Sequence, residues 1–406
     1  MDYSRLPIMY DVAVIGAGPG GSTISRYLAK AGLNICLVDK DAFPRDKPCG
    51  GGFSQRILDE FPYLRKRADD FLKGIAKVGV LHSPNRRVIL EGKVDMAVTL
   101  RTDFDNVLFE CAIEQGAEPI VGLRAKSLRT TSDYSEVYLS GGKSIKANLI
   151  VGADGVTSMV ARNTGLNKRW PNSTVTACRV VEVPATNDEI IERYTEQLHY
   201  HFFANLGELP GYAWIFPKRE TINVGLGIVG THARGLPSIF NAFVKYLKKE
   251  NLLMEDSDLK KAKGALVPTN GPIRRSYANR CLLVGDSAGM VSPLTGGGIA
   301  YAMKAARYAV PVIQTCIENS DFTATSLEDY ETAWRRAFGN EFKEQLLAQK
   351  IFTSPFTEVL FAIGSRDKKI QTMVSESMAE SSEQGISITN LVARTLLVCL
   401  KSAIRV

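Results

Sequence analysis

The chain contains 406 residues, of which 45% are hydrophobic and 23% are charged, and its mean hydropathy is −0.05. This composition is typical of a globular protein of two or three domains, and it excludes a disordered, collagen-like or multi-span membrane protein. The 50 Lys and Arg against 43 Asp and Glu give a net charge of +7 without a run of five like charges. Nucleic acid is therefore not an expected partner.

The seven cysteines contain no CxxC pair, and the four histidines are not spaced with them as metal ligands. We therefore expect no metal site and a reducing, cytoplasmic environment. Residues 1–10 contain no apolar segment typical of a signal peptide, and no window approaches the ~20 apolar residues of a membrane span. Any membrane contact is expected to be peripheral, at the inner face.

A strand, a turn, a helix and a second strand are predicted in the first forty residues. The apolar runs at residues 11–15 and 35–38 are typical of buried parallel strands. Between them, Ile24, Tyr27 and Leu28 recur at helical spacing as far as Gly32. This order indicates the βαβ unit that opens a nucleotide-binding domain.

The turn in this unit satisfies the GxGxxG pattern. Gly16 permits a tight turn, Gly18 lets the backbone approach a pyrophosphate, and Gly21 allows the helix and strand to pack closely. Asp39 lies 18 residues after Gly21. This is close to the spacing of ~20 residues expected for a carboxylate that binds a ribose hydroxyl. A glycine turn with a purely structural role is the alternative, but the complete context favours dinucleotide binding.

Two further buried strands are predicted at residues 147–152 and 281–284, each ending in a turn with Gly and Asp. Because they lie far from the first unit, we expect one domain to be assembled from separated segments. Segments 71–100 and 171–275 instead alternate apolar and polar residues, which favours a mostly antiparallel second sheet. After residue 320 the pattern is helical, with Ser326 as the expected N-cap.

The predicted fold class is therefore α/β with an α+β second domain. We assign residues 1–70, 101–170 and 276–320 to a Rossmann-like dinucleotide-binding domain. Residues 71–100 and 171–275 form an antiparallel β-sheet substrate domain, and residues 321–406 form a C-terminal helical region.

Three motifs together indicate which dinucleotide is bound: GxGxxG, Asp154-Gly155 and Gly285-Asp286. In this order they resemble the FAD-dependent family of the p-hydroxybenzoate hydroxylase fold. The resemblance implies FAD as cofactor, with Asp286 at the ribityl chain and the glycines from residue 296 at the flavin ring. A helix that begins there would stabilise the anionic reduced flavin through its dipole. The cofactor-binding residues expected in this way are Gly16, Gly18, Pro19, Gly20, Gly21, Asp39, Lys40, Cys49, Gly50, Gly52, Arg101, Ala125, Asp154, Gly155, Asp286, Gly297, Gly298 and Ile299.

Two other segments, PCGG at residues 48–51 and YxWxFP at residues 212–217, resemble the geranylgeranyl reductases, in particular the digeranylgeranylglycerophospholipid reductases. The resemblance extends to about residue 320. It implies FAD-dependent saturation of C=C bonds in geranylgeranyl chains, on archaeal-type glycerol ether phospholipids, with NAD(P)H, a ferredoxin or a deazaflavin as the external electron donor. The substrate-binding residues that it implies are Tyr212, Trp214, Phe216, Pro217 and Gly225.

The aromatic segment also carries information of its own. Tyr212, Trp214 and Phe216 are spaced by two, so on a strand they share one face, where they could line an apolar pocket or pack in a core. Reduction of an isolated alkene needs a proton in addition to the hydride, one for each carbon of the double bond. Cys49 and Tyr212 are the catalytic candidates for supplying it, and water is an equal candidate. His201 and its neighbour at position 199 are interpreted as structural.

Residues 386–406 are predicted to form an amphipathic helix. Arg394, Lys401 and Arg405 share one stripe. The opposite stripe contains Leu391, Leu396, Val398 and Leu400. Packing against the body is favoured over docking at an anionic membrane surface.

Two other functions remain open from the sequence: an FAD-dependent aromatic monooxygenase, and a non-catalytic protein that binds flavin and prenyl lipid.

Overall fold

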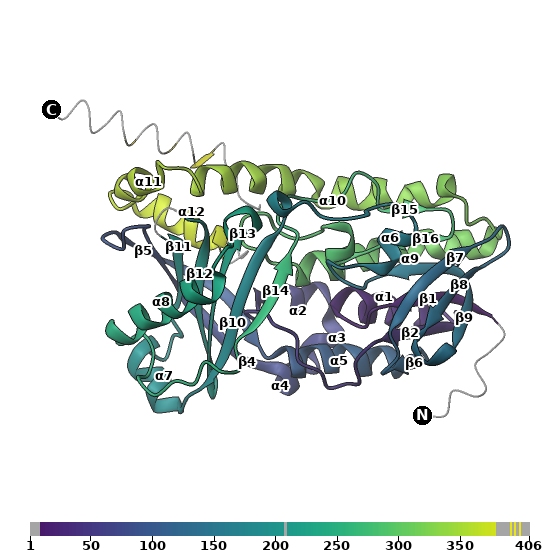
Figure 1. Ribbon diagram of the computed structural model, residues 1–406, viewed down its shortest axis with the longest axis horizontal. Helices are drawn as coiled ribbons and strands as arrows, with labels where there is room; N and C mark the ends of the chain where they lie inside the picture. Colours follow the sequence, from purple (N-terminus) through teal and green to yellow (C-terminus); the bar gives the residue numbers. More distant parts are fainter. Residues whose placement is uncertain (1–8, 207–208, 379–389, 392–393, 395–397, 399–406) are drawn as a thin grey trace.

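A computed structural model describes residues 9–206, 209–378, 390, 391, 394 and 398. Two eight-stranded sheets follow one another along the long axis of the molecule (Figure 1). The long helices α9 (Ile299–Asn319) and α10 (Ala324–Phe352) run beside each other along one side of this arrangement. The predicted α/β class with a second sheet and C-terminal helices is confirmed.

The first sheet brings together strands that are far apart in the sequence. Its order is β15-β16-β9-β1-β2-β6, and β1, β2, β6, β9 and β16 pair in parallel. The hairpin of β7 and β8 joins it through β9. The strands are β1 (Tyr10–Ile15), β2 (Ile35–Asp39), β6 (Glu118–Val121), β7 (Ala125–Thr130), β8 (Ser135–Leu139), β9 (Ser144–Gly152), β15 (Tyr277–Ala278) and β16 (Cys281–Leu283). Assembly of this sheet from separated segments, as expected, places the turns after β1, β9 and β16 at one edge.

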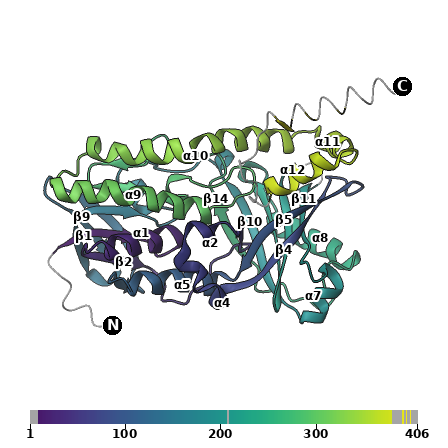
Figure 2. The same cartoon turned by 180° about the vertical axis from the view of Figure 1, so that it is seen from behind.

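Helices cover this sheet because its strands are apolar on both faces. The first helix, α1 (Pro19–Lys30), packs against α5 (Arg101–Ile113) and α9 (Figure 2). Four shorter helices complete this half: α2 (Ile57–Glu60), α3 (Pro62–Arg65), α4 (Ala68–Phe71) and α6 (Met159–Asn163).

The second sheet has the order β14-β10-β13-β12-β11-β4-β5-β3, and its pairs are antiparallel except β4 with β11. Its strands are β3 (Gly52–Ser54), β4 (Leu72–His82), β5 (Ile89–Thr99), β10 (Thr176–Pro184), β11 (Tyr200–Leu206), β12 (Leu209–Lys218), β13 (Thr221–Val229) and β14 (Lys263–Val267). Strand β3 lies in a segment that we assigned to the first domain, yet it pairs with β5 here. The domain boundaries therefore remain a proposal.

The two faces of the second sheet pack against different helices. An apolar cluster joins one face to α8 (Leu236–Lys249), and α7 (Asn187–Tyr194) lies at the same end.

His82 and His201 form a hydrogen bond of 2.8 Å between their rings inside the sheet. Burial, with a smaller effect of Arg86, lowers the pKa of His82 to about 4, and burial, with smaller effects of the neighbouring histidines, lowers that of His201 to about 3. Both imidazoles are therefore neutral at pH 7.

The helix expected after residue 320 begins three residues earlier than predicted. Thr323, not Ser326, is the N-cap of α10, because its hydroxyl accepts the N–H of Ser326 at 3.5 Å. Among the elements that the structure describes, α11 (Thr357–Gly364) and α12 (Lys368–Met378) follow. Within the described residues, no single helix is long and apolar enough to cross a membrane; α10 and α11 together pass that test by length and composition but are bent by 99°.

The predicted C-terminal amphipathic helix is described at few positions. Arg394 forms an ion pair of 2.7 Å with Asp367, and Leu391 and Val398 are partly buried against the apolar cluster on the second sheet. These contacts favour packing against the body for the described residues. The remaining members of the two stripes lie outside the described residues: Leu396, Leu400, Lys401 and Arg405.

Candidate functional site

Two cavities meet between the sheets. A groove runs over the ends of β1, β2 and β9, and a second, more apolar cavity lies between the start of α9 and the face of β12. Lys47, Pro48, Leu266 and Asp286 line both of them. An elongated ligand could therefore extend from the groove into the apolar cavity.

The glycine turn at the end of β1 is shaped by close backbone contacts. Gly16 has a φ of +101°, and a Cβ there would lie 2.3 Å from the carbonyl oxygen of Ala153. A Cβ on Gly21 would lie 1.8 Å from the carbonyl oxygen of Gly16. Helix α1 then begins without a side-chain cap, which leaves its first turn available to an anion.

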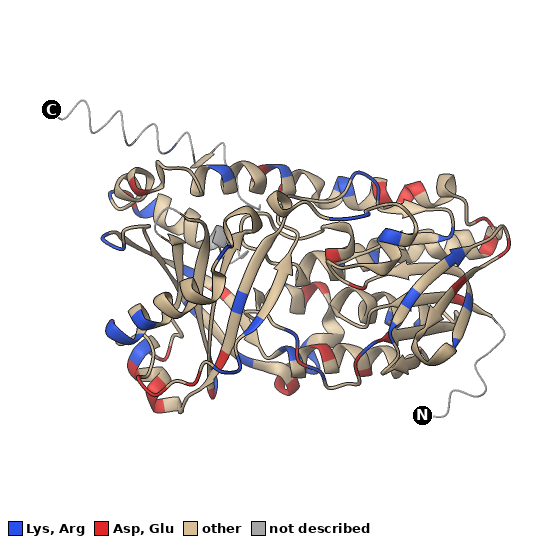
Figure 3. Cartoon of the chain, in the orientation of Figure 1, with Lys and Arg blue, Asp and Glu red and all other residues tan. Residues whose placement is uncertain are grey.

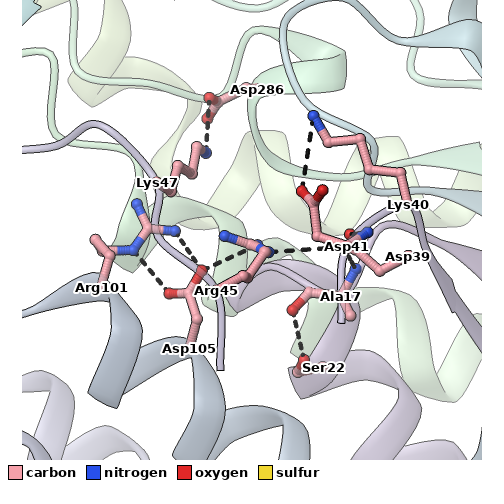
Figure 4. A network of polar contacts seen from close by, with 10 residues as sticks. All are labelled: Ala17, Ser22, Asp39, Lys40, Asp41, Arg45, Lys47, Arg101, Asp105 and Asp286. Atoms are coloured by element: carbon pink, nitrogen blue, oxygen red, sulfur yellow. Dashed lines mark hydrogen bonds and ion pairs between the residues drawn. The ribbon is translucent and has the colours of Figure 1, made fainter. Parts of the chain in front are cut away.

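Asp39 holds this turn as well as lining the groove. Its Oδ2 accepts the N–H of Ala17 at 2.8 Å, and its Oδ1 accepts the N–H of Asp41 at 3.0 Å. Arg45 approaches Asp39 at 3.9 Å (Figure 4). The expected contact of Asp39 with a ribose stays a prediction, and the structure gives this carboxylate a second role.

A buried carboxylate links Arg45 to the expected cofactor arginine (Figure 4). Asp105 is fully buried and accepts two hydrogen bonds of 2.7 Å from Arg101. It also pairs with Arg45 at 3.0 Å. Burial opposes the charge of Asp105, but the two guanidinium groups lower its pKa below the usual value. This network fixes Arg101 at the wall of the apolar cavity.

The predicted cofactor residues divide between the two cavities. Those that line the groove are Gly16, Gly18, Asp39, Lys40, Ala125, Asp154, Gly155 and Asp286. Those that line the apolar cavity are Pro19, Cys49, Gly50, Gly52, Arg101, Asp286, Gly297, Gly298 and Ile299. Gly20 and Gly21 line neither cavity; Gly20 faces Ala302 of α9, so both glycines serve the packing of α1.

Asp154 provides a direct test of whether a polar ligand fits the groove. Its Oδ2 accepts the N–H groups of Met159 and Val160 at 2.6 and 3.1 Å. Its Oδ1 is buried and has no hydrogen-bond partner among the described residues. Burial raises the pKa of Asp154. A buried oxygen of this kind fits a ligand with hydroxyl or amide donors, as FAD has.

The other end of the site is the beginning of α9. Gly298 is its N-cap without a side-chain cap, and a Cβ there would lie 3.0 Å from Oδ1 of Asp286. Lys47 reaches Asp286 at 3.8 Å, at the junction of the two cavities (Figure 4). Backbone N–H groups and a helix dipole therefore face the apolar cavity at the position expected for the flavin.

The loop that contains Cys49 is pressed against the second sheet. A Cβ on Gly50 would lie 2.7 Å from the Phe216 ring, and one on Gly51 would lie 2.1 Å from the carbonyl oxygen of Thr99. Gly51 also has a φ of +74°. Because only glycine fits these contacts, the loop holds Cys49 at the wall of the apolar cavity.

The aromatic side chains of β12 line this cavity, and two of them, Trp214 and Phe216, also belong to the buried apolar cluster on this face of the sheet. Tyr212, Trp214 and Phe216 are joined there by Phe202 of β11, whose ring centroid lies 5.4 Å from that of Phe216. Nε1 of Trp214 donates to Oδ1 of Asn223 at 2.7 Å, which fixes the indole. Asn223 also donates to the carbonyl oxygen of Cys49 at 3.0 Å, so it connects the indole with the Cys49 loop.

Two expected substrate residues do not line the cavity. Pro217 points away from the face of Phe216 because side chains alternate along a strand. Gly225 lies behind Trp214, since a Cβ there would lie 2.1 Å from the indole. Its role is to leave room for that ring.

Sequence reasoning missed several residues of the site, among them Arg45, Asp105, Phe202 and Asn223. The spacing of Arg101 and Asp105 by four on a helix is a signal for an ion pair and could have been used. The other three become visible only when distant strands and loops are brought together.

The comparisons with known proteins agree with this geometry. Residues 9–339 match the FAD binding domain family. The digeranylgeranylglycerophospholipid reductase of Methanocaldococcus jannaschii is 31% identical over 394 residues, which cover 96% of this chain and 95% of that protein. A digeranylgeranylglycerophospholipid reductase of Methanopyrus kandleri is 30% identical, over 93% of this chain and 96% of that protein.

Solved structures show the same fold. A geranylgeranyl bacteriochlorophyll reductase-like protein from Thermoplasma acidophilum superposes with a TM-score of 0.77 at 22% identity, covering 95% of both chains. A flavoprotein/dehydrogenase from Cytophaga hutchinsonii gives a TM-score of 0.76 at 15% identity, covering 97% of this chain and 100% of that one. The glycine turn, the paired cavities and these likenesses lead to one conclusion: the chain belongs to the FAD-binding domain family and, within it, to the digeranylgeranylglycerophospholipid reductases.

Proposed function

We propose that this protein is an FAD-dependent reductase that saturates C=C bonds of geranylgeranyl chains carried by a glycerol phospholipid. The observation that carries the proposal is the junction of two cavities: a polar groove suited to a dinucleotide opens into an aromatic cavity at the start of α9. An apolar chain can lie against Tyr212, Trp214 and Phe216 at that junction. The names of the curated relatives support the same substrate class.

When bound and reduced, FAD would supply the hydride for one alkene carbon. The chain's residues have three tasks: to bind the cofactor, to hold the isoprenoid against the aromatic face, and to provide a proton for the second carbon. The apolar lining excludes water from the bound chain.

For the proton we propose the thiol of Cys49. The hydroxyl of Tyr212 donates to the carbonyl oxygen of Thr295, which engages its proton. Arg101 lines the same cavity as Cys49, and although burial opposes its charge, Asp105 raises its pKa, so a permanent cation faces the cavity that holds the thiol. The thiol of Cys49 lines the same cavity and is the other protic side chain among the catalytic candidates.

The proposal is tested by incubating the chemically reduced holoenzyme with a geranylgeranyl glycerophospholipid and following the lipid by mass spectrometry. We expect a gain of two hydrogens for each double bond. Cys49→Ala should slow this step strongly while FAD remains bound; unchanged turnover would identify Tyr212 or water as the proton donor. No gain in mass with any strong reductant would contradict the reductase.

The aromatic monooxygenase is not favoured, because the relatives that cover nearly the whole chain carry the name of reductases. It predicts oxygen insertion into a phenol with NADPH and air. The same mass measurement distinguishes the two.

We further propose that an external donor reduces the flavin and that the lipid is reached from a peripheral position on the membrane.

A further inference from the structure

A third cavity extends the apolar cavity away from the expected flavin position. The two share Thr176, Phe202, Tyr212, Gly227 and Thr269 in their walls. The third cavity then reaches Phe352, Thr353 and Phe361, at the corner between α10 and α11. Apolar space therefore runs from the reaction site to this corner.

The outer face of α11 is apolar and exposed. Phe361 is buried in the cavity wall, but Phe356 just before the helix is 70% exposed and Val359 is 55% exposed. Ile89 at the start of β5 is 51% exposed, and the neighbouring β4–β5 hairpin is tied to α11 because Glu358 accepts the N–H of Asn85 at 3.1 Å. Large apolar side chains exposed this strongly and close together mark an interaction surface.

Basic residues border this apolar face. Four basic residues are exposed there: Arg87 in the β4–β5 hairpin, Arg366 after α11, and Lys368 and Lys369 in the first turn of α12. Figure 3 colours the Lys and Arg positions of the chain blue. The acidic residue of this turn, Asp367, is neutralised by Arg394. Even with the carboxylate of Glu358 on α11, the four exposed cations give the border a net positive charge, which complements an anionic surface.

We propose that the α11 surface docks onto the anionic headgroups of a lipid bilayer. This surface consists of the apolar residues Ile89, Phe356 and Val359 and the surrounding basic residues Arg87, Arg366, Lys368 and Lys369. This inference rests on the proposed function and names the surface through which the lipid is reached. A chain already in a bilayer is out of water, so a protein that draws it in has to place an apolar opening at the membrane. The α11 corner is where the apolar cavity and the exposed apolar face meet.

The test measures co-sedimentation of the FAD-loaded protein with vesicles of phosphatidylcholine and phosphatidylglycerol, and with vesicles of phosphatidylcholine alone. Wild type should bind the anionic vesicles, and added salt should weaken that binding. Phe356→Asp combined with Val359→Asp should weaken it about tenfold or more. The matched control is Ile191→Asp on α7, which changes another exposed apolar residue and should bind like wild type.

A second pair of variants tests the charges. Lys368→Glu with Lys369→Glu should also weaken binding to anionic vesicles about tenfold. Both positions lie in the first turn of α12, where acidic residues are favourable, so folding is preserved. Lys260→Glu with Lys261→Glu changes the net charge equally at an exposed site elsewhere and should have a smaller effect.

Equal vesicle binding by wild type and both α11-surface variants would overturn the inference. A change from dimer to monomer in the variants, without a change in vesicle binding, would assign the surface to a second copy of the chain instead. Reduction of detergent-dispersed lipid is measured in parallel. The variants should reduce detergent-dispersed lipid as well as wild type does. If wild type does not reduce this lipid, the proposed function is contradicted, whereas the docking surface is judged by vesicle binding.

Discussion

Replacing Asp105 by Asn should destabilise the protein far more than its small change in shape suggests. Asp105 is fully buried and is the shared partner of Arg101 and Arg45. Asn keeps the volume but removes the charge and turns one acceptor into a donor that faces a guanidinium group. Leaving buried charges uncompensated costs about 3–5 kcal/mol. At about 2.1 cal/mol/K of unfolding entropy per residue, this corresponds to a fall in Tm of roughly 4 to 6 °C for the chain of 406 residues.

The matched control is Asp103→Asn on the same helix. Asp103 pairs with Lys73 at 2.7 Å, but its side chain is 28% exposed. Its loss should therefore cost only about 1 kcal/mol. Calorimetry at a fixed, saturating FAD concentration compares the two variants. If Asp105→Asn lowers Tm no more than Asp103→Asn does, the network does not stabilise the site in the way inferred here.

Three further predictions concern the cofactor, the substrate and pH. Asp286→Ala should reduce FAD retention, because a carboxylate at the junction of the cavities can accept hydrogen bonds from sugar hydroxyls worth about 1.5–3 kcal/mol each; a fully yellow purified variant would contradict this. Trp214→Ala should slow lipid turnover and leave the flavin spectrum unchanged, whereas loss of FAD at unaltered activity per folded molecule would indicate a packing role. The pKa values of His82 and His201, lowered by burial, mean that the unfolded chain binds more protons than the folded one below about pH 6.5. Their contribution to stability is complete above that pH and is lost as the pH falls towards 4 and then 3, so His82→Gln should flatten the dependence of Tm on pH in this range.

Local patterns made much of the fold predictable. The βαβ unit follows from apolar strands and a glycine turn within forty residues, and the spacing of Tyr212, Trp214 and Phe216 correctly predicts a shared face. The position of Gly225 behind the indole could not be read in this way, since it depends on the register between β12 and β13. The N-cap at Thr323 was missed because Ser326 is also a residue type that caps helices.

The polar parts of the site were the least predictable. Asn223 belongs to a strand of the second sheet and Cys49 to a loop 174 residues earlier, and their hydrogen bond exists only in the assembled protein. A single Asn among apolar strand residues gives no signal of such a contact. The pairing of Arg45 with Asp105 depends in the same way on how a loop folds back over a helix.

The first sheet also has a consequence for the order in which the protein is made. Residues Ile150 to Gly152 of β9 pair with Cys281 to Leu283 of β16, so the ribosome has to add 129 residues after residue 152 before the pairing can begin. At ~5 to 20 residues per second this takes roughly 6 to 26 s. During that time an apolar strand edge is open in the nascent chain, and the helix start that completes the FAD site has not yet been synthesised. FAD can therefore stabilise the finished chain against unfolding, but it cannot protect the unfinished one.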